Sequence, residues 1–86
     1  MINEKDNPVE WALMGLELEE LQEHLNDLIN EISSKEVIDE KDFHVDIAHL
    51  YAHLNRIWNR RNHIGEVGNE DFSRYSKFPE DIKPIG

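Results

Sequence analysis

Three histidines and one aspartate have the types and the spacing that a metal site needs. Asp46, His49 and His53 follow one another at steps of three and four residues, which places them on one face of a helix. The pairing of two helices described below brings His24 beside His53. Imidazole nitrogens with a carboxylate form a ligand set that suits zinc, nickel or copper. The sequence therefore predicts, as one hypothesis, a metal site built from these four side chains.

The same histidines also have a structural interpretation. His49 and His53, four residues apart, are typical of any amphipathic helix that carries histidines at the boundary between core and solvent. The helix motif of metalloproteases has a glutamate directly after its first histidine, and Leu50 occupies that position here. We therefore expect no proteolytic activity and keep divalent-metal binding as the alternative function.

Two acidic motifs suggest a second kind of chemistry. Glu17-Leu-Glu-Glu20 and Glu36-Val-Ile-Asp39 resemble the paired ExxE and ExxD motifs of the MazG-like nucleoside triphosphate pyrophosphohydrolases. The resemblance covers eight residues and implies an all-helical enzyme whose carboxylates hold magnesium. In that family both motifs lie on packed helices, whereas Glu36 and Asp39 fall in a predicted connection between helices. We therefore expect no catalytic residues in this chain.

The charge of the chain argues against nucleic acid as a partner. Nineteen acidic residues stand against nine lysines and arginines, which gives a formal net charge of −10 and a surface that repels phosphate backbones. Arg56, Arg60 and Arg61 surround Trp58, but an acid-rich first helix can pair with them. We expect the partners to be proteins, with no DNA or RNA among them.

The amino-acid composition limits which other kinds of site and localisation are expected. The chain has no cysteine, which removes disulfides and thiolate metal sites. Its apolar runs are only a few residues long, and its first residues lack a basic segment leading into an apolar one. We expect a soluble cytoplasmic protein without membrane contact and, unless the histidines bind zinc or nickel, without a cofactor.

Two helices must position all these side chains. Apolar residues recur at alternating steps of three and four, the pattern of heptad helices. Asn7 as N-cap, with Pro8 next, predicts where the first helix begins, and Gly65 predicts where the second ends. The predicted fold is all-α: an antiparallel two-helix hairpin in a single domain of residues 1–86, with helices over about 8–33 and 42–64 and an irregular tail over 65–86. The apolar seam consists of Trp11, Met14, Leu18, Leu21, Leu25, Leu28 and Ile32 in the first helix and Phe43, Ile47, Leu50, Leu54, Ile57 and Ile64 in the second.

The two helices have a predicted register. If the seams face each other across a short connection, His24 lies beside His53, and Glu17 lies beside Arg60 as an ion pair. Residues 1–6 are polar and are expected to be frayed.

Several apolar side chains lie outside this seam. A lone hairpin would expose them and would have a thin core, so we expect a homodimeric four-helix bundle. The expected function is that of a small acidic interaction or regulatory module without catalytic activity, which binds another protein through its acidic face or its tail. The candidate interface residues are Trp11, Leu13, Leu16 and Trp58, with Phe72, Tyr75 and Phe78 in the tail.

Overall fold

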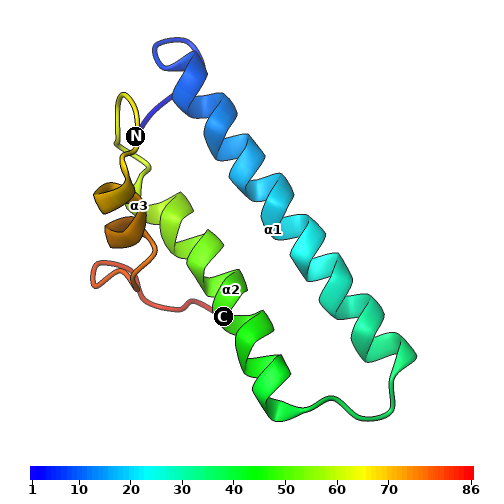
Figure 1. Cartoon of the computed structure of the whole chain (residues 1–86). Helices are drawn as coiled ribbons and strands as arrows, with labels where there is room; N and C mark the ends of the chain where they lie inside the picture. Colours follow the sequence, from blue (N-terminus) through cyan, green and yellow to red (C-terminus); the bar gives the residue numbers. More distant parts are fainter.

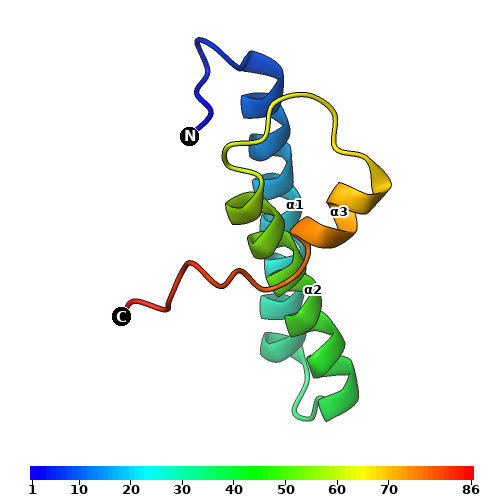
Figure 2. The same ribbon diagram turned by 90° about the vertical axis from the view of Figure 1, so that its left-hand side faces the viewer.

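The computed structural model describes all 86 residues and contains three helices and no strand. The first two, α1 (Pro8–Ser34) and α2 (Glu40–Asn59), form an antiparallel hairpin, and α3 (Asn69–Tyr75) follows. Figures 1 and 2 show α1 on one side of α2, with α3 on another. The predicted all-α class and the packing of the first two helices against each other are confirmed. No helix in the chain has the length and apolar character that crossing a membrane requires.

The start of α1 is held by the residues before it. The helix begins at Pro8 as predicted, but the Asn7 side chain does not cap it. Instead, Asn7 Oδ1 accepts a hydrogen bond from the Asn3 backbone N–H at 3.3 Å. The expectation of a frayed N-terminus is wrong, because Ile2 is buried and its backbone N–H donates to the Arg61 carbonyl at 2.8 Å. The first residues therefore join α1 to the end of α2.

The end of α2 is set by the chain that follows it. The helix ends at Asn59, several residues before the predicted end at residue 64. Asn59 Nδ2 donates to the carbonyls of Tyr75 and Lys77, both at 2.9 Å. Gly65 has the positive φ of 93° expected at a chain reversal, but it follows an irregular segment rather than the helix. The predicted last turn of α2 is thus absent, and the end of the helix contacts α3 and the residues after it instead.

The predicted irregular tail contains a helix. Residues 69–75 form the short helix α3, and the residues on either side of it are irregular. Asn55 Nδ2 donates to the Ser76 carbonyl at 2.9 Å, and the Trp58 indole N–H donates to Asp81 at 2.9 Å. The C-terminal segment is therefore tied to α2 along much of its length.

The predicted seam of α1 is only half buried. Met14 and Leu28 are buried, whereas Leu18, Leu25 and Ile32 are 44–55% exposed. The exposed three belong to one row of the helix, and the buried two belong to the next row. Compared with the prediction, α1 is rotated about its own axis. The row that contains Met14 therefore faces α2, together with the polar row next to it. The predicted facing of the two complete seams is therefore wrong.

Candidate functional site

A buried group of charged and polar side chains lies between the two long helices. Glu17 comes from α1, and His53 and Arg56 come from the same face of α2, three residues apart. Arg56 Nε donates to Glu17 Oε1 at 2.7 Å, and His53 Nδ1 lies 3.0 Å from the same oxygen. The three side chains are 4–10% exposed. The predicted ion pair of Glu17 with Arg60 is therefore wrong, and Arg56, about one turn earlier, takes that place.

Arg56 also connects this group to the C-terminal part of the chain. Its Nη1 donates to Ser76 Oγ at 2.9 Å, and its guanidinium carbon lies 4.5 Å from the centre of the Phe72 ring. A planar guanidinium with several donors suits such simultaneous contacts. One arginine thus links α1, α2 and α3.

The proton on His53 can be assigned from its neighbours. A carboxylate can only accept a hydrogen bond and a guanidinium can only donate, and His53 Nδ1 lies near both Glu17 and, at 3.2 Å, Arg56 Nη2. An unprotonated Nδ1 at 3.0 Å would face the lone pairs of Glu17, whereas Arg56 already has acceptors in Glu17 and Ser76. We therefore assign the proton to Nδ1, which donates to Glu17. In the neutral ring, Nε2 then carries a free lone pair.

His53 Nε2 is the one polar side-chain atom of the chain that is fully buried without a hydrogen-bond partner. The residue as a whole is only 3% exposed. Buried polar atoms in folded proteins nearly always have a partner, so an exception of this kind calls for an explanation.

Two further histidines lie against His53. The ring centroid of His24, on α1, is 5.1 Å from that of His53, which confirms the predicted neighbourhood of these two residues. The ring of His49, one turn earlier on α2, is 4.2 Å from His24 and 4.8 Å from His53. One nitrogen of each ring lies within 4.8 Å of the other two. The structure therefore brings together the three histidines singled out from the sequence.

The predicted aspartate is not part of this group. Asp46 is absent from the set of potential ligand atoms that lie within 4.8 Å of one another, whereas Glu20 and Glu17 both belong to such a set with His53. Glu20 lies one turn before His24 on α1. The carboxylates that are grouped with His53 therefore come from α1.

The electrostatics of the cluster favour a neutral His49. Partial burial lowers the pKa of His49 below its ordinary value of 6.5, and the neighbouring His24 and His53 rings lower that pKa further. The charge of Arg56 also lowers the pKa of His49, whereas the charge of Asp46 raises it weakly. His49 is therefore neutral near pH 7, with a lone pair on one ring nitrogen.

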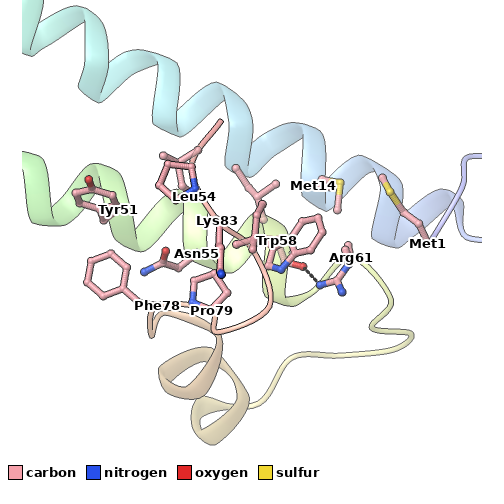
Figure 3. Close-up of a pocket in the computed structure, with 13 residues that line it drawn as sticks. Met1, Met14, Tyr51, Leu54, Asn55, Trp58, Arg61, Phe78, Pro79 and Lys83 are labelled. Atoms are coloured by element: carbon pink, nitrogen blue, oxygen red, sulfur yellow. Dashed lines mark hydrogen bonds between the residues drawn. The ribbon is translucent and has the colours of Figure 1, made fainter. Parts of the chain in front are cut away.

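An apolar groove of about 620 Å³ lies on another side of the hairpin. Figure 3 shows Met14 of α1, Leu54 and Trp58 of α2, and Phe78 of the C-terminal segment around it. The dashed line in that view is the hydrogen bond from Arg61 to the Trp58 carbonyl, 2.9 Å long. Two of the candidate interface residues, Trp58 and Phe78, thus line one groove.

The other candidate interface residues are dispersed. Tyr75 is half-buried, with its hydroxyl 2.8 Å from His63 Nδ1. The remaining four are between 39% and 51% exposed: Trp11, Leu13, Leu16 and Phe72.

The acidic motifs do not form a carboxylate site. Glu36 and Asp39 lie in the connection between α1 and α2 and are exposed. Glu17, from the other motif, is held by Arg56. The arrangement implied by the resemblance to the pyrophosphohydrolases is therefore not present.

Comparison of the chain with protein-family models, with curated proteins and with solved structures found no match.

Proposed function

We propose that this chain is a homodimeric protein-protein interaction module in which two hairpins pair into a four-helix bundle. The observation that carries the proposal is the surface area of the single chain, 6914 Å². A compact monomer of 10.2 kDa exposes about 5,300 Å² by the usual scaling with mass. The excess of about 1,600 Å² per chain is of the size that a subunit buries in an obligate homodimer.

The composition of one side of the hairpin supports a second copy as the occupant. On α1, the row formed by residues 11, 15, 18, 22, 25, 29 and 32 contains no charged residue. On α2, the row of residues 43, 47, 51, 54 and 58 contains none either. We call these two rows together the uncharged face. Leu25 and Leu54 are 44% and 49% exposed in it, and Leu54 continues the face into the apolar groove.

Net charge favours self-association through this face. Two chains of charge −10 repel each other, so contact between their acidic surfaces would be unfavourable. A twofold axis through the uncharged face would instead pair apolar rows with their own copies, except at Trp58, which Arg61 and Asp81 of the same chain already contact. The uncharged face is therefore self-complementary.

The dimer would present two acidic outer surfaces to other proteins. On α1, Glu19, Glu23 and Asp27 are exposed and lie off the uncharged face. A partner with a basic surface fits them, and the exposed Phe72 and Phe78 add apolar contact area near the C-terminus.

Sedimentation equilibrium at micromolar concentration tests the proposal. We expect a mass of about 20 kDa, twice that of the chain. Added salt should strengthen the association slightly, because it screens the repulsion between two acidic chains. A mass of 10.2 kDa at both low and high salt would contradict the proposed dimer.

A further inference from the structure

We infer that the three clustered histidines bind a divalent transition-metal ion of the zinc, nickel or copper group. His24, His49 and His53 supply the nitrogen ligands, and the carboxylate of Glu20, which lies near His53, would turn toward the ion to supply an oxygen ligand. This inference is independent of the proposed dimer, because all four side chains belong to one hairpin.

The first support is the free nitrogen of His53. Its Nε2 is buried and unpartnered, and with the proton on Nδ1 it carries a lone pair. Leaving a buried acceptor unpaired is unfavourable. A metal ion is the kind of partner that such a lone pair accepts, and the rings of His24 and His49 lie against the His53 ring, with centroids 5.1 and 4.8 Å from its own.

The second support is the hydrogen bond on the opposite side of the same ring. Metal-binding histidines usually donate their other ring N–H to a carboxylate or carbonyl, which fixes the tautomer and the orientation of the ring. Glu17 Oε1 takes this role for His53 at 3.0 Å, and Arg56 holds Glu17 at 2.7 Å. Glu17 is therefore a positioning residue rather than a ligand.

The nitrogens are close enough to share an ion, but rings must turn to bind it, because the planes of His49 and His53 are stacked at 27° to each other. A tetrahedral zinc ion with Zn–N distances of about 2.0–2.1 Å holds its ligand atoms roughly 3.3 Å apart. One nitrogen from each of the three histidines lies within 4.8 Å of the other two. His53 is fixed by its hydrogen bond, but His49 is exposed and can turn its ring toward an ion. Side-chain rotation of His49 and His24 would close the remaining gap.

The charges and the ligand types indicate which ion fits. With neutral histidines, the site holds the carboxylates of Glu17 and Glu20 against the single charge of Arg56, so a dication is attracted. Three imidazoles and one carboxylate suit zinc, nickel or copper, whereas magnesium and calcium prefer oxygen ligands. Zinc is the simplest probe because it has no redox chemistry.

Calorimetric titration of the full chain, treated with a chelator and then dialysed, with zinc chloride at pH 7 tests the inference. We expect one ion per chain with a dissociation constant in the micromolar range or below, and no heat from magnesium. The variant His49→Ala should bind at least tenfold more weakly. His44→Ala is the matched control, because His44 is exposed on the same helix outside the cluster and should leave binding unchanged.

A second variant tests the positioning role of Glu17. Glu17→Gln should weaken zinc binding 10- to 100-fold, as loss of such an outer carboxylate usually does. Nitrogen NMR of the metal-free wild type should show the His53 proton on Nδ1, and zinc should shift the Nε2 resonance. Circular dichroism of each variant checks that α1 and α2 are formed.

Two results would overturn the inference. One is wild-type binding no tighter than millimolar. The other is equal affinity in His49→Ala and His44→Ala, since binding would then not involve the cluster.

Discussion

The two sides of the α1–α2 hairpin differ in how their side chains are stabilised. On one side, Glu17, His53 and Arg56 hydrogen-bond to one another and are buried within a single chain. On the uncharged face, Leu25 and Leu54 remain about half exposed. Hydrogen-bonded charges need defined partners at defined distances, so they determine how the helices pair, whereas apolar contact is less directional. The buried side thus sets the register, and we expect the uncharged face to contribute most of its stabilisation when a second chain covers it.

The largest expected effect comes from removing one member of the buried ion pair. Glu17→Leu leaves Arg56 buried without its carboxylate, and breaking a buried pair in this way costs about 3–5 kcal/mol of unfolding free energy. The double variant Glu17→Leu/Arg56→Met should recover most of that loss, because both buried charges are gone. Urea unfolding at one fixed protein concentration measures both. A single variant as stable as wild type would show that the pair does not hold the register.

The second largest effect is expected when a charge is introduced on one face of α1 and compared with the same charge on another face. Leu25→Glu places a charge on the uncharged face, and we expect the dimer dissociation constant to rise about 100-fold or more, that is about 2.7 kcal/mol. Leu16→Glu is the matched control: Leu16 is 51% exposed and shares its side of α1 with Glu20 and Glu23. Sedimentation equilibrium of both variants measures the dimer dissociation constant. Dissociation by Leu16→Glu alone would instead place the interface at the stripe of Leu13 and Leu16.

A smaller effect is expected where the buried group meets α3. Ser76→Ala removes the acceptor of Arg56 Nη1 and should lower the unfolding free energy by about 0.5–1.5 kcal/mol. Ser73→Ala, at an exposed position of α3, is the control and should change little. Equal stability of the two variants would mean that the hydrogen bond from Arg56 to Ser76 does not contribute to the unfolding free energy.

The smallest effect is the pH dependence contributed by His49. Its pKa is lowered in the folded chain, so the unfolded chain, with a pKa near 6.5, takes up the proton first as the pH falls. Stability from this group is present above about pH 6.5 and is lost as the pH falls through the folded-state pKa. The groups facing His49 are His24 from α1 and Asp46, His53 and Arg56 from α2.

Urea midpoints at pH 7.5 and 5.5 measure this contribution. The wild type should lose more stability on acidification than His49→Gln, which has no titrating ring at that position. If both lose the same amount, the lowered pKa of His49 does not contribute to folding.

Local signals explain which parts of the fold could be predicted from the sequence. Asn7 and Pro8 mark a helix start through neighbouring residues alone, and α1 begins where they place it. The proximity of His24 and His53 follows from heptad geometry, because both lie on the same edge of their helices.

Long-range contacts explain what could not be predicted. Arg56, in the last turn of α2, and Arg60, just after the helix, are four residues apart. A shift of one turn between the helices therefore exchanges them as partners of Glu17 while the apolar pattern stays almost the same. The end of α2 at Asn59 depends on the hydrogen bonds that Asn59 donates to the carbonyls of Tyr75, at the end of α3, and Lys77, which have no local signal. The unpartnered Nε2 of His53 follows from burial and from a tautomer set by Glu17, and both require the structure.

The most direct test of the central claim, that a second copy covers the uncharged face, is a filtered NOE experiment. Isotope-labelled and unlabelled chains are mixed, and only contacts between different chains are detected. We predict cross-chain contacts among the methyl groups of Leu18, Leu25 and Leu54. Cross-chain contacts confined to Leu13 and Leu16, or none at all at millimolar concentration, would contradict the account.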